Sequence, residues 1–509
     1  MHRKILSLTF IFATLTSTPL FSDEAKINIG ERLFSDPRFS RSFLENSNND
    51  VNNLNAKGTS CLTCHQADAK FDPTSGIGMR GYADFTARSP VPFRLQDEKK
   101  ETLRNTQGLV GIGSLFLKER FAHWDGEFPD HSHTVLGNMT GRNMGWLPHE
   151  KERALKNMVT VLREDSGDSS LAKEFGGSYQ RVFLGVDPSI PDSLRLSPED
   201  TLDLQTATDE MIRQKVIELI TAFMDDLDFE KVEVEKEGLK HYKIYDSPYD
   251  HFLYKNKLPV FPKKGQNLAT YSLDLRKKIA EIKNPKFIEK RFFPTHGRSF
   301  EFGPREWEGM KVFYNIANED GTRRRGACFS CHLPPAFSDQ KFHNVGTMQR
   351  EYDRIHGDGS FLKVEIPSLK KRNQIFYMKR AKGEDPNAFD LGVWNFFARA
   401  DKPELTQYIR KNLCPSLSSR PCENSTLLPL LEASFKTPTL RNLNHSAPYF
   451  HNGSSPHLMH LLHEYKRASE LKRKKQLRGG ANELIGMFLF HKEIHSLKAF
   501  LDSLNGSYD

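Results

Sequence analysis

Two short stretches decide how this chain folds: Cys61-Leu62-Thr63-Cys64-His65 and, in the second half, Cys328-Phe329-Ser330-Cys331-His332. Both follow the pattern Cys-x-x-Cys-His, the attachment sequence for a c-type haem. The two thiols can each form a thioether with one vinyl group of the porphyrin, and the adjacent imidazole can bind the iron. A Cys-x-x-Cys pair can also hold half a zinc site or act as a redox dithiol, but neither role requires the histidine that follows in both copies. The sequence therefore predicts two covalently bound haem c groups, with His65 and His332 as iron ligands.

A similar helical segment precedes each haem motif. Gly30-Glu31-Arg32-Leu33-Phe34 and Gly309-Met310-Lys311-Val312-Phe313 share the pattern Gly-x-x-Leu/Val-Phe. This repetition predicts two related cytochrome-c-like units. Helical spacing continues over 150–164 and 201–229, and an apolar stripe predicts an amphipathic closing helix, formed by Ile494, Leu497, Leu501 and Leu504. The expected fold class is mostly α, with two cytochrome-c-like domains that each bind one haem.

The N-terminus has the layout of a secretory signal. Arg3 and Lys4 precede an apolar run over 5–18, which is followed by the acidic pair Asp23-Glu24. A membrane anchor is the alternative, but the run is shorter than the roughly 20 residues needed to span a bilayer. Because covalent haem attachment in bacteria occurs outside the cytoplasm, we expect a periplasmic protein. We expect a signal peptide at 1–22, an N-terminal haem domain with a helical extension at 23–235, a linker or crossing segment at 236–300, and a C-terminal haem domain at 301–509.

Composition narrows the class of protein. The chain has 509 residues, 37% of them hydrophobic and 11% aromatic, which is ordinary for a soluble globular protein. No later run is apolar enough to span a membrane, so no transmembrane segment is expected in the mature protein. The formal charge of +8 is not a nucleic-acid-binding signature.

Cys414 and Cys422 are not used by the haem motifs, and in an oxidising compartment we expect a local disulfide between them, with two free thiols as the alternative.

Beyond the haem motifs, five blocks resemble the bacterial di-haem cytochrome c peroxidase and MauG family. They are Gly30-Glu31-Arg32-Leu33-Phe34-Ser35-Asp36-Pro37, Trp124-Asp125-Gly126, Phe342-His343-Asn344-Val345-Gly346-Thr347, Phe435-Lys436-Thr437-Pro438-Thr439-Leu440-Arg441-Asn442 and Ala447-Pro448-Tyr449-Phe450-His451-Asn452-Gly453. The resemblance implies that hydrogen peroxide reacts at the His65 haem, while the His332 haem relays electrons from a small cytochrome or cupredoxin. It also implies that Trp124 is the residue that bridges the haems, with an ordinary core aromatic as the alternative.

The resemblance further implies a calcium ion between the domains. The corresponding positions are Asn105, Ser446 and Pro448, whose oxygens suit calcium. His343 and His451 also belong to matched blocks, but we expect propionate or backbone contacts for them rather than iron ligation.

Two departures from the family's peroxidases concern the sixth ligands of the haems. Where the peroxidases have a methionine ligand to the C-terminal haem, this chain has Tyr465, as MauG does. A tyrosine ligand would lower the reduction potential of this haem and favour high oxidation states. Two alternatives stay open: Tyr465 only packs within its helix, or the helix is shifted by a turn so that Met459 takes the ligand position. No histidine occurs between His65 and His123 to act as the distal ligand of the N-terminal haem. Met79 stands near that place, and either it binds the iron or the site stays open.

A third departure concerns proton transfer. The family's distal glutamate, a general acid/base in peroxide cleavage, is replaced by Asn143, which cannot exchange a proton at neutral pH. Unless Arg142, His131 or His133 substitutes for it, peroxide cleavage should be slower. Three functions therefore stay open: a peroxidase supplied by a small redox protein, a MauG-like enzyme that oxidises a protein or organic substrate, and a non-enzymatic di-haem electron-transfer protein.

Three histidines lie close together near the C-terminal end of the chain: His457, His460 and His463. Their spacing resembles a metal-binding comb, but no carboxylate or cysteine set completes it. We therefore expect surface histidines.

Overall fold

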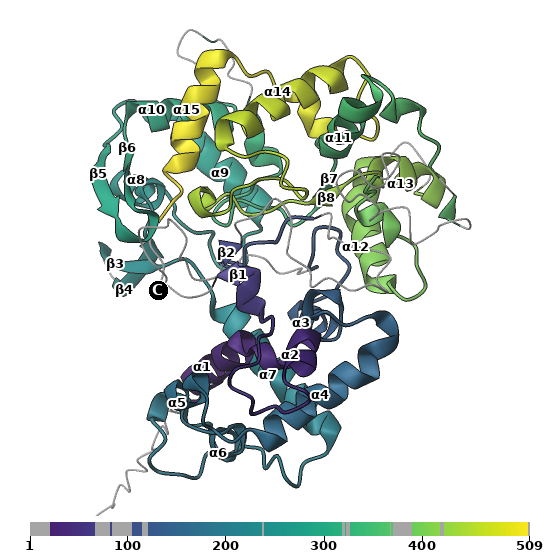
Figure 1. Cartoon of the computed structure of the whole chain (residues 1–509). Coiled ribbons are helices and arrows are strands. Elements are labelled where there is room, and N and C mark those ends of the chain that lie inside the picture. The colour runs from purple at the N-terminus through teal and green to yellow at the C-terminus, as the bar shows by residue number, and fades with distance from the viewer. Residues whose placement is uncertain are drawn as a thin grey trace, which may run out of the picture.

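The computed structural model describes residues 21–66, 82–83, 104–113, 121–236, 239–317, 321, 326–366, 368–369, 389–417 and 422–506. The helices of this part are α1 (Phe21–Ser35), α2 (Arg41–Asn46), α3 (His131–Met139), α4 (Lys151–Glu164), α5 (Ser170–Glu174), α6 (Tyr179–Leu184), α7 (Asp209–Asp226), α8 (Pro248–Lys255), α9 (Leu268–Ala280), α10 (Pro304–Phe313), α11 (Thr347–His356), α12 (Pro403–Leu413), α13 (Asn424–Leu431), α14 (Leu458–Arg473) and α15 (His491–Asp502). The strands form four antiparallel pairs: β1 (His65–Gln66) with β2 (Tyr82–Ala83), β3 (Lys231–Lys236) with β4 (Leu239–Tyr245), β5 (Ile288–Phe293) with β6 (Arg298–Phe302), and β7 (Phe342–His343) with β8 (Phe435–Lys436). The mostly helical fold class is confirmed, and the two halves lie one above the other in Figure 1.

In the N-terminal half, α1 packs across α7. Gly30 makes this close crossing possible, because a Cβ at that position would lie 2.0 Å from the carbonyl oxygen of Leu219. α1 ends at Ser35, directly before Asp36-Pro37. The predicted helix at 150–164 is α4, whereas the helix expected over 201–229 begins only at Asp209, because the Thr208 side chain caps it there.

The C-terminal half repeats this arrangement with α10 and α15. A Cβ at Gly309 would lie 1.8 Å from the carbonyl oxygen of Ser496. The predicted apolar stripe of α15 is confirmed, since Ile494, Leu497 and Leu501 are buried. In each half, then, a glycine-containing helix precedes the haem motif and crosses a long helix at close range, as expected for two related cytochrome-c-like units.

Residues 236–300, which we expected to be a linker or crossing segment, are packed structure. Tyr249 and Phe252 on α8 and Leu275 on α9 are buried in the same core as α10 and α15. The linker expectation was therefore wrong: the stretch 258–265, rich in proline and glycine, marks only the turn between α8 and α9.

A third hydrophobic cluster fills the segment between β7 and β8. It is rich in aromatic residues, among them Phe361, Trp394 and Tyr408, and it also includes Phe121 and Trp124 from the N-terminal part of the chain. The predicted local disulfide between Cys414 and Cys422 is present beside it, with Cα atoms 5.6 Å apart.

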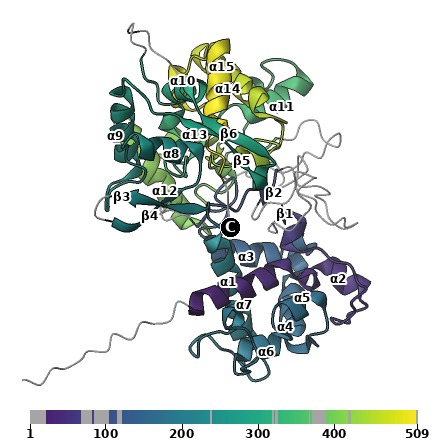
Figure 2. The same cartoon turned by 90° about the vertical axis from the view of Figure 1, so that its left-hand side faces the viewer.

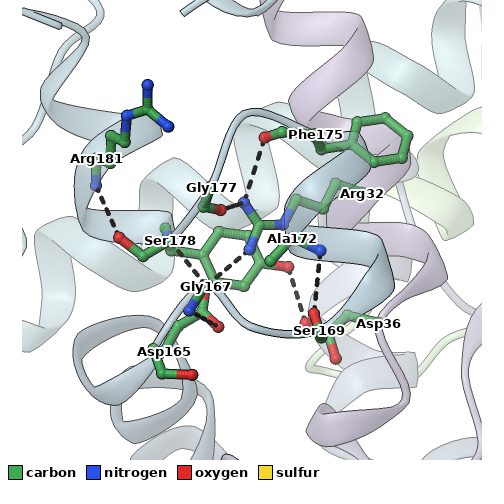
Figure 3. Close-up of polar contacts among 12 residues, drawn as sticks. Arg32, Asp36, Asp165, Gly167, Ser169, Ala172, Phe175, Gly177, Ser178 and Arg181 are labelled. Atoms are coloured by element: carbon green, nitrogen blue, oxygen red, sulfur yellow. Dashed lines mark hydrogen bonds and ion pairs between the residues drawn. The ribbon is translucent and has the colours of Figure 1, made fainter.

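Each half also contains buried ion pairs. In the N-terminal half, the Asp165 carboxylate accepts hydrogen bonds from Arg32 (2.7 Å) and Arg38 (2.8 Å), as Figure 3 shows for Arg32. In the C-terminal half, Arg441 donates two hydrogen bonds to Asp250, at 2.7 and 2.9 Å, and both side chains are at most 1% exposed. Figure 2 shows the two halves that these networks stabilise.

Within the described ranges, no helix combines the length and the apolar character needed to cross a membrane. The predicted signal peptide, apart from its last two residues, lies outside the described part of the chain.

Candidate haem sites and the interface between them

The second haem motif lines a cavity of about 250 Å³. Cys328, Cys331 and His332 all face it, and the 3-10 turn Cys328–Ser330 places them. His332 is buried, which lowers its pKa, and its Nδ1–H donates to the carbonyl oxygen of Phe337 at 2.9 Å. This bond fixes the ring and leaves Nε2 for a metal, the outer-shell arrangement that is usual for a histidine ligand.

The first haem motif occupies an equivalent place beside α1. The ring centres of His65 and Phe34 lie 6.2 Å apart, and Cys61 packs against the core of the N-terminal half. Burial and the nearby His123 lower the pKa of His65 to about 4, so its imidazole is neutral and can bind a metal.

The thiols of both motifs suit covalent attachment. Burial raises the pKa of Cys61 to about 12 and that of Cys328 to about 12. A buried site of this kind disfavours a charged thiolate and accommodates an uncharged thioether. The residues of both motifs therefore fit a covalently bound haem, held by Cys61, Cys64 and His65 in one half and by Cys328, Cys331 and His332 in the other.

Trp124 lies where the two halves meet. Its side chain is 9% exposed and lines the same cavity as His332. The indole Nε1–H donates to the carbonyl oxygen of Asn105 at 2.8 Å, and the Trp124 carbonyl accepts from the backbone N–H of Lys436 at 2.7 Å. The bond to Asn105 thus fixes the indole, and the bond from Lys436 fixes the Trp124 backbone against the second half.

Charged residues on either side of Trp124 hold the interface together. Arg104 donates to Asp125 at 2.5 Å and, with two nitrogens, to Asp390 at 2.7 and 2.9 Å. The ammonium of Lys436 donates to the carbonyl oxygen of Phe121 at 2.7 Å, and burial lowers its pKa to about 8. The sequence interpretation missed Arg104 and Lys436 as interface residues. Both stand close to residues that it named: Arg104 precedes Asn105, and Lys436 belongs to one of the blocks that resemble the family.

The positions predicted for calcium come together at this interface. The Asn105 amide nitrogen donates to the carbonyl oxygen of Pro448 at 2.5 Å, and the Asn105 backbone N–H donates to the carbonyl oxygen of His451 at 2.6 Å. Asn105 Oδ1 is buried and has no hydrogen-bond partner among the described residues. Ser446 lines the same cavity. A buried, unpartnered oxygen beside a backbone carbonyl fits an oxygen-liganded cation.

Tyr465 reaches the C-terminal haem cavity from α14. Its ring lies in the cavity lining with His332, and burial raises its pKa. Among the described residues that line the cavity, Tyr465 is present and Met459, the alternative six residues earlier, is not. The structure therefore brings together the two residues that the sequence interpretation assigned to opposite sides of one iron.

The residues predicted near the peroxide site lie in different surroundings from one another. Asn143 is exposed and donates to Asn138 Oδ1 at 2.9 Å, and Arg142 is half-buried on the same 3-10 turn. His131 lines the interface cavity with Trp124 and hydrogen-bonds Asp225 through Nδ1 at 2.6 Å. Met79 lies outside the described residues.

The two histidines of the matched blocks are held by other side chains. His343 Nε2 hydrogen-bonds the Asp339 carboxylate at 2.9 Å, and Nδ1 lies 3.8 Å from the sulfur of Cys331. His451 stacks on Phe435 with ring centres 3.5 Å apart.

Two family models match parts of this chain. A family model described as di-haem cytochrome c peroxidase matches residues 24–257, and one described as RoxA-like, cytochrome c-like, matches residues 434–472. Similar solved structures include a MauG-like protein associated with microbial copper homeostasis, at 15% identity over 95% of this chain and 90% of that one, with a TM-score of 0.46. Another is the diheme peroxidase BthA from Burkholderia thailandensis, at 14% identity over 95% of this chain and 86% of that one, with a TM-score of 0.45. No curated protein matches the chain.

The family match covers the first haem motif and the Trp124 block, and the second haem motif repeats the same site in the other half. Di-haem cytochrome c proteins of this kind are oxidoreductases with two c-type haems. Over residues 24–257, somewhat under half of its length, the chain matches the di-haem cytochrome c peroxidase family.

Proposed function

We propose that this protein is a periplasmic peroxidase that reduces hydrogen peroxide to water with electrons from a small cytochrome or cupredoxin. The observation that supports it most is Trp124, a buried indole fixed at the interface between the halves, in the lining of the C-terminal haem cavity. In this proposal His65 would hold the haem that supplies the chemistry with peroxide, and His332 would hold the haem that supplies electrons.

Bound haem would supply the redox chemistry. The residues of the chain hold and orient it: the hydrogen bond from His332 to Phe337 fixes one ligand, and the thiols of both motifs anchor the porphyrins. Arg104 and Lys436 keep the Trp124 block against the second half, so that the distance between the two sites stays constant.

Tyr465 favours a second candidate function, a MauG-like oxidation of a protein or organic substrate. Its ring lies in the same cavity as His332, from another element of the fold. A tyrosine ligand to this haem would lower its reduction potential and stabilise higher oxidation states, whereas a methionine ligand would raise the potential.

The spectra of the holoprotein distinguish these functions. Optical and electron-spin spectra should be recorded for the fully oxidised and the half-reduced protein, before and after stoichiometric hydrogen peroxide. A reaction that requires prior half-reduction supports the peroxidase, and a direct reaction of the fully oxidised protein supports the MauG-like function. If neither form reacts, both proposals fail and electron transfer alone remains.

The ligand role of Tyr465 has its own test. Tyr465→Met should raise the reduction potential of the C-terminal haem by roughly 100 mV or more, since axial ligands set haem potentials over about 0.8 V. Spectroelectrochemical titration measures the shift, and Met459→Leu is the matched control on the same helix. A shift in the control, with none in Tyr465→Met, would assign the ligand to Met459 instead.

A further inference from the structure

Three exposed histidines meet where α14 and α15 lie next to one another, as both views in Figures 1 and 2 show for these helices. His463 projects from α14, and His491 and His495 project from α15. The ring centres of His491 and His495 are 5.0 Å apart, and those of His463 and His491 are 6.0 Å apart. His491 is thus the central member of a three-imidazole cluster.

These three side chains make no other polar contact with the described residues. Within the described part of the chain, none of them has a hydrogen bond or an ion pair. The two other histidines of the sequence comb are occupied. His457 Nδ1 accepts from the backbone N–H of His460 at 3.2 Å, and His460 Nδ1 hydrogen-bonds Ser455 at 2.8 Å. The comb suggested by the sequence is therefore not a site, and only His463 of that comb joins the new cluster.

The spacing of the cluster suits a single metal ion. Residues four apart on a helix present neighbouring side chains, so His491 and His495 can chelate from one face of α15. Two imidazoles bound to one tetrahedral ion at a metal–nitrogen distance of about 2.0–2.1 Å have ring centres roughly 5 Å apart. The pair on α15 has that separation, whereas the ring centre of the exposed His463 lies 6.0 Å from that of His491, so a shared ion would have to draw His463 closer. Imidazole ligands select zinc, copper and nickel over calcium and magnesium.

We propose that His463, His491 and His495 form a surface site for a divalent transition-metal ion of the zinc, copper and nickel class. Glu493 lies between the two α15 histidines in the sequence, but it is buried, and its carboxylate accepts the N–H of Phe490 at 2.9 Å and so caps α15. We therefore expect the three imidazoles, with solvent, to hold the ion.

A bound ion would link the outer faces of two helices whose inner faces line the haem cavity. α14 carries Tyr465 into that cavity, and α15 carries Leu497 and Leu501 into it. The ion would therefore stabilise the wall of the C-terminal haem site, and metal binding should raise the unfolding temperature of the holoprotein.

Titration calorimetry with zinc tests the proposal on the holoprotein, in saturating calcium so that oxygen-liganded sites are filled. We expect one zinc ion per chain. Removing two ligands in His491→Gln/His495→Gln should weaken binding by at least about 100-fold, since outer-shell changes alone cost about 10–100-fold. His149→Gln, an exposed histidine in the other half, is the matched control and should bind as the wild type does.

Copper identifies the ligands independently. Electron-spin spectra of the protein with one equivalent of copper(II) should show coupling to imidazole nitrogens that is lost in the double variant, and His463→Gln should reduce the number of coupled nitrogens. The proposal is overturned if zinc binds the double variant as tightly as the wild type, or if the wild type takes up no zinc. Unchanged haem spectra in the double variant show that it is folded.

Discussion

At the residue scale, Trp124 combines packing with a position between two redox sites. It belongs to the aromatic cluster of the second half and is hydrogen-bonded to Asn105 in the first. We expect Trp124→Phe to keep both haems and the fold, because the aromatic packing is retained. Electron exchange between the haems should slow at least about tenfold, equivalent to about 1.4 kcal/mol in barrier height, because the readily oxidised indole is gone.

Stopped-flow optical spectroscopy after peroxide addition measures this rate. Trp394→Phe is the matched control, since Trp394 is buried in the same cluster but is not in the lining of the haem cavity. Equal slowing in both variants would assign the effect to packing rather than to the bridging position.

Asp165 shows how a buried carboxylate makes stability depend on pH. Burial raises its pKa, but Arg38 and Arg32 outweigh burial and hold the pKa below its ordinary value of 3.8. Because the folded pKa is lower than the unfolded one, the ionised carboxylate contributes stability above about pH 4 and loses it as the pH falls through the folded pKa.

We expect Asp165→Asn to cost about 3–5 kcal/mol of the free energy of unfolding at pH 7, because the buried Arg32 guanidinium loses its carboxylate partner and Arg38 keeps only Asp36. The variant should also lose less stability than the wild type between pH 4 and pH 2. Denaturant unfolding across this pH range measures both effects. Asp192→Asn, in an exposed ion pair with Arg195, should change stability by about 0–1 kcal/mol, and a similar cost in both variants would contradict the argument.

At the scale of elements, the two glycine crossings define the two cytochrome-like units. In each, a helix backbone lies so near the next that a Cβ would fall about 2 Å from a carbonyl oxygen, at 2.0 Å for Gly30 and 1.8 Å for Gly309. Backbone cannot move aside as a flexible side chain can. The glycines therefore set the distance between the paired helices and, through it, the position of the haem motif that follows.

Gly30→Ala and Gly309→Ala should each destabilise the protein by about 3 kcal/mol or more, at the upper end of the usual cost of overpacking. Gly486→Ala is the control, because a Cβ there meets no atom within 4 Å. Thermal unfolding of the holoproteins, with haem content from the optical spectrum, measures the result. A loss no larger than that of the control would mean that the helices can separate at little cost.

At the scale of the whole molecule, the two halves are joined by contacts between segments far apart in the sequence. Arg104 bonds Asp390, Asn105 bonds Pro448, and Lys436 bonds Trp124. The candidate calcium position lies in this seam, with the unpartnered Asn105 Oδ1. A bound calcium ion would give Asn105 Oδ1 a partner and so stabilise the interface.

Calcium should therefore raise the unfolding temperature of the holoprotein, by the equivalent of about 2.7 kcal/mol at a calcium concentration 100 times the dissociation constant. Asn105→Ala should abolish this response, whereas Asn105→Asp, which keeps a side-chain oxygen, should preserve it. Scanning calorimetry with calcium and with a chelator measures the difference. A calcium response that survives in Asn105→Ala would locate the ion elsewhere.

The sequence by itself determined what contiguous residues encode. The two haem motifs, the apolar stripe of α15 and the short-range disulfide each depend on spacing within one segment. Family resemblance added Trp124 and Tyr465, and the structure places both in one cavity.

Only the tertiary structure decided which distant segments meet. It placed 236–300 in a core instead of a linker, set Lys436 against Trp124, and brought His463 to His491 rather than to His457. These pairings depend on how whole helices pack, and packing is the sum of many weak contacts that no single stretch of sequence contains.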